Sequence, residues 1–310
     1  MKNLYLKKIL SYGIVIVIFY FVFKTLFEKW ESVKFYELDF NYYFIVLSAI
    51  FFLSSGIVMP VIWRSIAITL MPSANVSKFT FIKAFAYSLI TRYVPGKIWQ
   101  YAGQAYMVSN KGIPMQTIMA SVAYDMILST ISACFFSILL IVITMPFDIG
   151  FRYYLITLIA ILVGGFVIWR QGFFRLINFI LVRMQKPPIP SSLLLKTNNV
   201  AYFLIYYCGA YLLSGAGFFF MAKAIADVDF NLLFNYIGIY VFATAMGTLA
   251  IILPAGLGLQ ESLIVVLLRS YLPVSIATII SLLARVWSIF LGIVLFCIIW
   301  LISQLKYFKD

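Results

Sequence analysis

The sequence predicts an all-α membrane protein, a polytopic bundle of transmembrane helices, on the strength of two observations. First, 64% of the 310 residues are hydrophobic and 11% are charged, whereas soluble domains have about 45–50% apolar and about 25% charged residues. Second, the apolar residues form continuous runs instead of the alternating pattern of barrel strands. Because hydrocarbon satisfies no backbone hydrogen bonds, runs of this kind are predicted to be helical.

Seven segments are long and apolar enough to cross a bilayer, which takes about 20 residues each. In chain order they are 9–27, 41–70, 115–145, 152–170, 200–223, 231–253 and 273–303. The first follows a basic start, as in a signal peptide, but no small-residue cleavage pattern comes after it. We therefore expect it to be retained as the first helix.

Two further segments, 79–108 and 255–271, are apolar but interrupted. Proline removes a backbone donor and glycine loosens a helix, so both segments contain places where a helix can stop at membrane depth. Non-helical backbone survives there only where protein or a water-filled cavity shelters it. We expect re-entrant or half-spanning helices in both. The predicted helix-break residues are Pro95, Gly96, Pro254, Gly256 and Gly258.

The distribution of charge predicts the orientation. With the N terminus in the cytoplasm, most of the 23 Lys and Arg residues lie on the cytoplasmic side and most of the ten acidic residues on the outer side, as membrane proteins prefer. A cytoplasmic C terminus then requires an even number of crossings. That number is eight if 255–271 crosses the bilayer while 79–108 enters and leaves from the cytoplasmic side, and seven crossings is the alternative.

The chain is predicted to form a single transmembrane domain over residues 1–310. A Pro-rich linker at 186–190 could divide it into halves, 1–185 and 191–310, and residues 171–184 before it have the pattern of an interfacial helix. Interruptions in corresponding parts of two halves are typical of transporter sites built from discontinuous helices. The two predicted breaks have this placement, although the sequence match between them is short.

Several kinds of chemistry lack the residues that would support them. The sequence contains no His, which is the commonest metal ligand and general base. Its three cysteines, Cys134, Cys208 and Cys297, each lie within an apolar run. We expect no metal site, no cofactor and no disulfide framework. The net charge of +13 fits loops that orient helices and face anionic lipid headgroups, so we expect no nucleic-acid partner.

Three charged residues are predicted to lie at membrane depth. Asp125 and Glu261 are the carboxylates, and Arg285 lies in the middle of the last span. Charge in that position is costly and often functional, so we expect Asp125 and Glu261 to gate a site or balance its charge. The alternative is that each holds two helices together. Arg285 needs a partner, which is Glu261, Asp125 or a lipid phosphate that suits its planar fork.

The first break is surrounded by cations, aromatic residues and glutamines. If a helix restarts after Gly96, its free N–H groups and its dipole favour an anion at the break, and Arg92 and Lys97 add positive charge. The alternative is a belt of aromatic and basic residues at the headgroup level. On the first interpretation, the residues predicted to bind a lipid headgroup are Arg92, Lys97, Trp99, Gln100 and Arg285.

These motifs resemble those of a known family. Arg92-Tyr-Val-Pro-Gly-Lys-Ile-Trp, the turn Lys111-Gly-Ile-Pro, the carboxylate of Asp125 and Pro254-Ala-Gly-Leu-Gly-Leu-Gln-Glu look like the lysylphosphatidylglycerol synthase transmembrane-region family. The family includes the flippase domain of the multiple peptide resistance factor and many standalone members. The resemblance covers about residues 10–300.

The resemblance implies a polytopic protein of the bacterial or archaeal inner membrane that has re-entrant helices and handles or flips lipids. The sequence departs from the family pattern at Tyr124-Asp125-Met126, where many members have Glu-Arg, so an ion pair at that place is in doubt. The soluble aminoacyl-transferring domain of the full synthase is absent from this sequence. Lysyl transfer is therefore not implied.

The sequence supports one leading hypothesis and two alternatives. The leading one is a flippase-like lipid translocase, or a lipid-binding membrane protein, acting on an anionic phospholipid or a polyprenyl-phosphate-linked lipid. The first alternative is an intramembrane transferase with Glu261 as general base, which we disfavour because there is no His and no acidic pair for a nucleotide sugar. The second is a scaffold for a lipid- or glycan-modifying enzyme. The sequence does not indicate the oligomeric state.

Overall fold

The structure is a computed structural model that describes residues 41–89, 98–144, 193–250 and 256–307, together with a few single residues between 155 and 190. Every regular element in these ranges is a helix, which confirms the predicted all-α bundle. The predicted spans 9–27 and 152–170 lie outside the described residues, apart from a single helical residue at 155. So does most of the predicted interfacial helix at 171–184 and of the linker at 186–190, so the division into halves stays a prediction.

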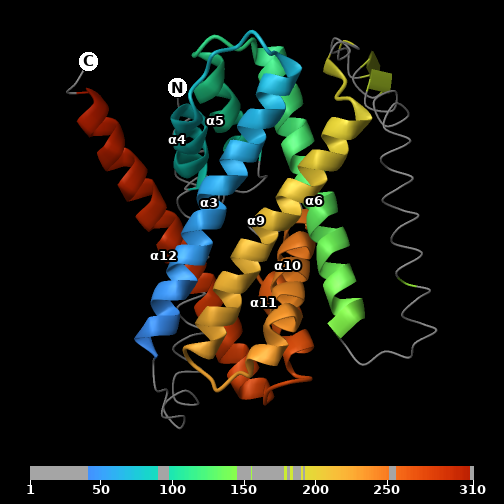
Figure 1. Cartoon of the computed structure of the whole chain (residues 1–310), viewed down its shortest axis with the longest axis vertical. Coiled ribbons are helices and arrows are strands. Elements are labelled where there is room, and N and C mark those ends of the chain that lie inside the picture. The colour runs from blue at the N-terminus through green and yellow to red at the C-terminus, as the bar shows by residue number, and fades with distance from the viewer. Residues whose placement is uncertain are drawn as a thin grey trace, which may run out of the picture.

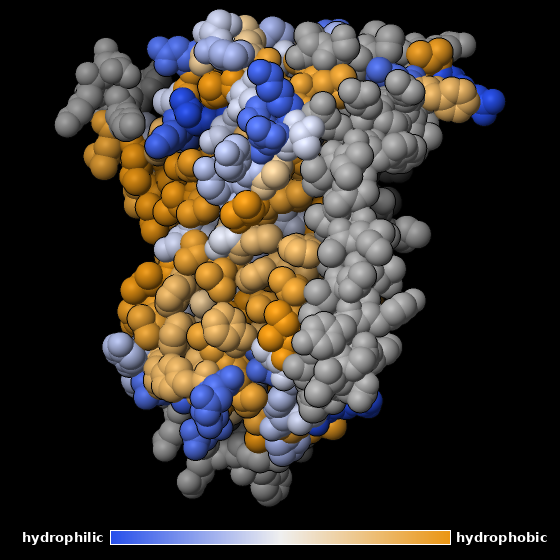
Figure 2. All heavy atoms as spheres, turned by 45° about the vertical axis from the view of Figure 1, so that its right-hand side comes forward, coloured by the Kyte–Doolittle hydropathy of each residue, from blue (hydrophilic) through white to orange (hydrophobic). Residues whose placement is uncertain are grey.

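Eight α-helices and one short 3₁₀ helix make up the described chain (Figure 1). They are α3 (Tyr42–Leu70), α4 (Lys78–Leu89), α5 (Ile98–Ser109), α6 (Met115–Thr144), α9 (Thr197–Lys223), η3 (Phe230–Leu232), α10 (Leu233–Leu249), α11 (Leu259–Leu268) and α12 (Val274–Tyr307). Five helical stretches are long and apolar enough to cross a membrane, namely α3, α6, α9, α12 and α10 with η3. Figure 2 shows an apolar band over the middle of the visible face, between polar residues at both ends.

The first four described helices form one unit. α3 begins at the lower end of Figure 1, where the Asn41 side chain caps it by accepting from the backbone N–H of Tyr43, 3.1 Å away. α4 and α5 form a helical hairpin in the upper half of the molecule, and we call this pair the first hairpin. α6 then runs from the upper to the lower end. The interrupted segment 79–108 is therefore two short helices, and the residues of its tip, 90–97, lie outside the described ranges.

The next four helices form a second unit of the same order. α9 runs from the upper to the lower end, α10 and α11 form a second hairpin in the lower half, and α12 returns to the upper end (Figure 1). The Asn235 side chain at the start of α10 donates to the hydroxyl of Tyr271 just after α11, 2.7 Å away. Near the tip, the Gln260 amide donates to the Thr244 hydroxyl over 3.2 Å. The second hairpin is therefore antiparallel and begins and ends at the lower end.

The length of α11 bears on the expectation that 255–271 crosses the bilayer. α11 has ten residues, which at 1.5 Å per residue span about 15 Å, half of the roughly 30 Å hydrocarbon core. Together with α10 it makes one excursion into the bundle and back. α10 with η3 is long enough to cross, and a hairpin that begins and ends at one end of the bundle fits two crossings as well as a return. The crossing of 255–271 and the count of eight therefore stay predictions.

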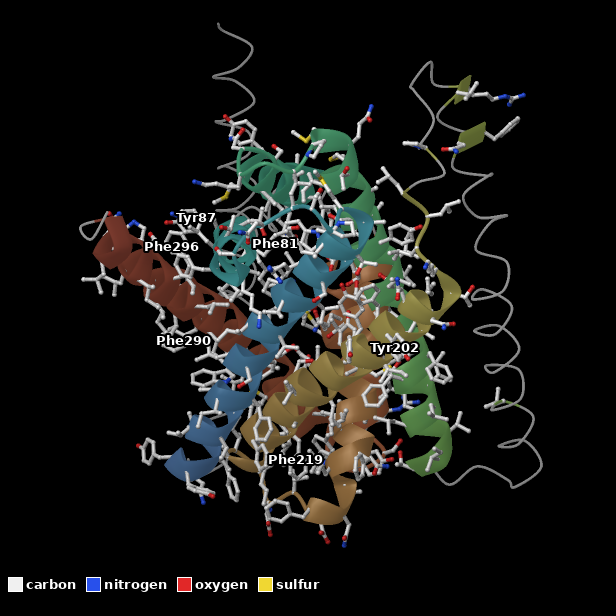
Figure 3. All side chains as sticks on the ribbon, turned by 45° about the horizontal axis from the view of Figure 1, so that its top comes forward. Phe81, Tyr87, Tyr202, Phe219, Phe290 and Phe296 are labelled. Carbon is white, nitrogen blue, oxygen red and sulfur yellow. The ribbon has the colours of Figure 1, made fainter. Side chains whose placement is uncertain are left out.

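The two units run in opposite directions. The backbone N–H of Asn41, before α3, donates to the carbonyl of Ala224, after α9, over 3.0 Å, so α3 and α9 pack antiparallel. The start of α10 lies beside the end of α6, where Asn235 donates to the carbonyl of Thr144 over 3.3 Å. In the matching place, α4 packs against the last part of α12. There Tyr87 meets Phe296 edge to face at 4.9 Å between ring centres (Figure 3). The described helices thus form an inverted repeat.

Small residues allow the close packing of α9, which lies at the centre of the bundle. A Cβ on Gly217 would approach the Phe52 ring of α3 to 2.7 Å, and one on Gly215 would approach Ile237 of α10 to 2.6 Å. Helix interfaces in membranes use small residues in this way because lipid provides no hydrophobic force between helices. Two serines of α3 add hydrogen bonds, since Ser48 donates to the Gly217 carbonyl and Ser55 to that of Ala210.

Candidate functional site

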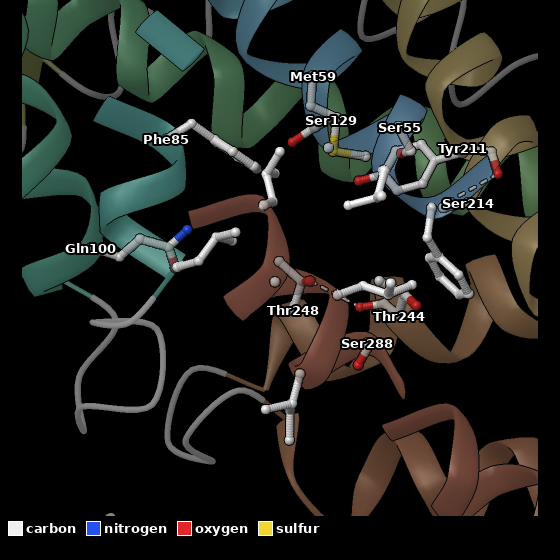
Figure 4. A pocket seen from close by; sticks show the side chains of 18 of the residues that line it. Ser55, Met59, Phe85, Gln100, Ser129, Tyr211, Ser214, Thr244, Thr248 and Ser288 are labelled. Atoms are coloured by element: carbon white, nitrogen blue, oxygen red, sulfur yellow. Dashed lines mark hydrogen bonds between the residues drawn. The ribbon is translucent and has the colours of Figure 1, made fainter. Parts of the chain in front are cut away.

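A cavity of about 620 Å³ is lined by described residues of both hairpins and of the other four helices (Figure 4). The first hairpin contributes Phe85, Leu89 and Gln100 to its wall, and the second contributes Thr244 and Thr248. The polar residues on its wall from the other four helices are Ser55, Asp125, Ser129, Tyr207, Tyr211, Ser214, Arg285 and Ser288. Ligand sites commonly have volumes of about 300–1,000 Å³ with a few polar groups in an apolar wall, and this cavity has both properties.

Arg285 is the cation on the described part of the cavity wall, and two of its partners come from α11. Its Nε lies 3.2 Å from Oε1 of Glu261, an ion-pair contact without good hydrogen-bond alignment. Its Nη1 donates to Oε1 of Gln260 over 2.9 Å. The Arg285 side chain is 8% exposed and that of Glu261 is 15% exposed, so each charge needs the other. Glu261, Asp125 and a lipid phosphate were the predicted partners of Arg285, and the structure shows Glu261 in contact with it.

Glu261 also closes the N-terminal end of α11. Its Oε2 accepts from the backbone N–H of Gly258 over 2.7 Å, so the third residue of the helix caps the residue before the first turn. A carboxylate in this position satisfies an otherwise unpaired N–H and interacts favourably with the helix dipole. Glu261 therefore holds α11 and Arg285 together, and its side chain is not part of the cavity wall.

Asp125 lies on α6 and has a different environment. The Tyr207 hydroxyl of α9 donates to its Oδ1, and within the described residues the carboxylate forms no ion pair. It lies on the cavity wall together with Tyr207 and Ser129. Sequence reasoning missed Tyr207, because a tyrosine in an apolar, tyrosine-rich helix carries no mark of such a role.

Asp125 and Arg285 occupy matching places in the inverted repeat, in α6 and α12. Gln100 and Gln260 do so too, near the starts of α5 and α11, and both pairs are 160 residues apart in the sequence. All four side chains lie on the wall of the same cavity. The repeat therefore presents one carboxylate and one guanidinium to a shared space.

Other predicted site residues are only partly described. Gln100 lies on the cavity wall and is 5% exposed, and its neighbour Gln104 donates to the Ser88 hydroxyl over 2.7 Å. Trp99 belongs to α5, but its side chain is outside what the structure describes. The predicted residues that fall outside the described ranges are Arg92, Lys97, Pro95, Gly96 and Pro254.

The two described break glycines have backbone conformations that favour glycine. Gly256 has φ 68° and Gly258 has φ 84°, both in the left-handed region. A Cβ on Gly256 would lie 2.6–2.8 Å from backbone atoms of Gly247 in α10. The turn before α11 thus needs glycine at 256 for conformation and for space.

No group of three or more His, Cys, Asp or Glu residues that could hold a metal ion occurs in the described part of the chain. The carboxylates and the guanidinium at the cavity are engaged with side chains or face the cavity singly. The side chains at the cavity can therefore hold a polar group by hydrogen bonds and by charge.

Comparisons of the chain with protein-family models, with curated proteins and with solved structures find no match.

Proposed function

We propose that this protein binds a membrane lipid with the headgroup in the cavity and moves it between the two leaflets, as a flippase-like lipid translocase. The observation that supports this most is the meeting of two helical hairpins, which enter the bundle from opposite ends, at one cavity with polar groups in its wall. Discontinuous helices that meet near the midplane in an inverted repeat are a common architecture of transporters. The resemblance noted from the motifs agrees with this proposal.

The wall of the cavity suits a molecule with a polar and an apolar part. The polar side carries Arg285, whose planar guanidinium matches the oxygens of a phosphate. The rest of the wall includes apolar residues of α3, α4 and α12, among them Leu53, Met59, Leu89, Ile289, Ile293 and Phe296. Ile293 is 53% exposed. The cavity therefore reaches the surface that faces lipid, where acyl or polyprenyl chains can remain in the membrane.

We place the protein in the inner membrane of a bacterium or archaeon, with the upper end of Figure 1 in the cytoplasm. Described basic residues at or near the upper helix ends are Arg64, Lys78, Lys111 and Lys196, and the charged residues at the lower ends are Lys223, Asp227, Asp229 and Arg269. Positive charge gathers on the cytoplasmic side of membrane proteins, which favours this orientation and agrees with a cytoplasmic N terminus.

The test is exchange of lipid between leaflets in vesicles that contain the purified protein. Phosphatidylglycerol and phosphatidylcholine with a fluorescent acyl chain are each added, and the label accessible to an impermeant quencher is followed over time. We expect exchange above that of protein-free vesicles, and a loss of about tenfold or more in Arg285→Gln, because a charge contact to the headgroup is removed.

Arg269→Gln provides the matched control, since Arg269 is exposed and lies after α11 away from the cavity. It should exchange lipid as the wild type does. If folded wild-type protein moves neither lipid, translocation of these lipids is wrong. Co-purification of a lipid- or glycan-modifying enzyme that needs this protein would then favour the scaffold hypothesis.

A further inference from the structure

Four serines on the cavity wall have their hydroxyl protons committed to backbone carbonyls. The bonds are Ser55 to Ala210, Ser129 to Met126, Ser214 to Tyr211 and Ser288 to Arg285, with lengths of 2.9, 3.2, 3.1 and 2.9 Å. A hydroxyl has one proton and two lone pairs. These side chains therefore offer acceptors to the cavity, and they come from four different helices, α3, α6, α9 and α12.

Asp125 adds a stronger acceptor. Tyr207 donates to one of its oxygens, and no second hydrogen bond reaches the carboxylate from any residue that the structure describes. The other oxygen is not among the buried polar atoms without a partner, so it is accessible from the cavity that Asp125 lines. An ionised carboxylate accepts only, with about four lone-pair sites.

Gln100 is a buried amide that faces the same space. It is 5% exposed, lies on the cavity wall (Figure 4) and forms no hydrogen bond with the residues in the described ranges. Its amide atoms are not among the buried polar atoms without a partner, so the amide is accessible from the cavity. Since an amide has both donors and an acceptor, it suits a hydroxyl, which also has both.

The donors on the wall are largely engaged with the protein. The Gln104 amide donates to Ser88, that of Gln260 donates to Thr244, and Arg285 contacts Gln260 and Glu261. The ligand that complements such a wall brings hydrogen-bond donors. Because the acceptors are spread over four helices, the donors of the ligand must be spread as well. Several hydroxyl groups on one ring or chain meet this requirement, whereas a single ammonium concentrates its donors at one point.

We propose that the headgroup bound in the cavity is a sugar or another polyol, and that Asp125 and Gln100 bind its hydroxyl groups. This inference rests on the proposed function, because it assigns a substrate class to the same cavity. Three tyrosines on the wall, Tyr101, Tyr211 and Tyr240, offer aromatic faces to the C–H groups of such a ring. Arg285 contacts the phosphate that joins the polyol to the lipid.

The experiment compares lipids that have the same acyl chains and differ in their donors. Phosphatidylinositol and phosphatidylmethanol carry the same single negative charge, but only the first has free hydroxyls. Phosphatidylethanolamine supplies an amine instead. Binding is measured as the rise in the melting temperature of the purified full-length protein in detergent, and transport as leaflet exchange in vesicles. We expect phosphatidylinositol to bind and to exchange about tenfold better than phosphatidylmethanol, as hydrogen bonds to a charged group predict.

Asp125→Asn and Gln100→Met should each lower the ratio of phosphatidylinositol to phosphatidylmethanol by about fivefold or more. The matched controls are Asp227→Asn and Gln304→Met, at exposed positions away from the cavity, and they should leave the ratio unchanged. Both cavity variants are examined because one of them could fail to fold.

The outcomes separate the two proposals. Exchange of all lipids at equal rates would overturn the polyol inference and leave translocation intact. Selective stabilisation by phosphatidylinositol without exchange of any lipid would support the polyol inference and overturn translocation. A preference for phosphatidylethanolamine would overturn the inference in favour of an amine headgroup.

Discussion

The two hairpins occupy equivalent places in an inverted repeat, and the second adds a charged network to the apolar packing that both have. The first hairpin packs through an apolar cluster in which Trp63 meets Phe81 edge to face at 4.7 Å. The second hairpin packs through a larger apolar cluster that includes Ile237, Val241 and Ile264. It also has the ion pair of Arg285 with Glu261, the cap that Glu261 makes on α11, and glycine contacts near its tip. Apolar packing thus stabilises both units, and a charged network is added in the second.

This difference predicts which of the two hairpins responds to a bound ligand. Apolar packing does not respond to a bound headgroup, whereas a charged residue on the cavity wall does. If a phosphate binds beside Arg285, as proposed, it competes with Glu261 for the guanidinium, and Glu261 also caps the start of α11. We therefore expect the position of the second hairpin to depend on the ligand.

The largest effect is expected from Glu261→Ala. The substitution leaves Arg285 buried without its carboxylate and removes the cap of α11, and breaking a buried pair costs about 3–5 kcal/mol. The melting temperature in detergent, followed with a dye that reacts with exposed thiols, should fall strongly. Glu261→Gln retains an acceptor for the Gly258 N–H and should lose less. Equal melting of Glu261→Ala and wild type would show that the network does not hold the second hairpin.

Gly256→Ala should have the next largest effect. A left-handed conformation costs a residue with a Cβ about 1–2 kcal/mol, and here the Cβ also meets the Gly247 backbone at 2.6 Å. We expect a lower melting temperature together with slower lipid exchange, since α11 must move away from α10. A variant with the melting temperature and the lipid exchange of the wild type would contradict the requirement for glycine at position 256.

Trp63→Phe tests the first hairpin. The Trp63 indole N–H donates to the Ser121 hydroxyl over 3.0 Å, and Ser121 keeps its own bond to the Ile118 carbonyl. Loss of one hydrogen bond and some packing predicts about 1–2 kcal/mol. Melting temperature should fall moderately, while the ratio of exchange rates for different lipids stays constant. A change in that ratio would mean that the first hairpin also responds to the ligand.

The smallest effect is expected from Gly103→Ala in α5. Nothing lies within 4 Å of the Cβ that the substitution adds, and alanine is favoured over glycine in a helix by about 0.5–1 kcal/mol. The melting temperature should stay the same or rise slightly. A clear fall would indicate that the first hairpin is packed as tightly as the second at this position.

The sequence predicted the class of the fold and the sites of interruption for a simple reason. Long apolar runs have one stable form in lipid, and proline with glycine ends a helix whatever surrounds it. At the second predicted break, α10 ends at Leu249 and α11 begins at Leu259, with Gly256 and Gly258 in the left-handed region between them. The first break lies outside the described residues. The packing of α11 was not predictable, because its apolar residues do not show where the helix meets its neighbours.

The sequence predicted which charged residues belong to the site better than it predicted which of them contact each other. Asp125, Glu261 and Arg285 attract notice in any apolar sequence, but the choice between the two carboxylates for Arg285 depends on how α11 packs on α12. The neutral polar residues of the site could not be identified from the sequence for another reason. Tyr207 and the cavity serines resemble the many other hydroxyl residues of these helices, and only their placement around one cavity distinguishes them.

The hairpins also determine how the protein meets an electric field. Each pairs a helix with an antiparallel neighbour, so their macrodipoles oppose each other along the membrane normal. Arg285 and Glu261 form a pair without net charge. Moving one elementary charge through the membrane is worth about 2.3 kcal/mol per 100 mV, and Glu261 lies on α11 whereas Arg285 lies on α12. A shift of the second hairpin away from Arg285 would carry the Glu261 charge with it. Transmembrane voltage would then act on that charge as well as on the charge of the lipid.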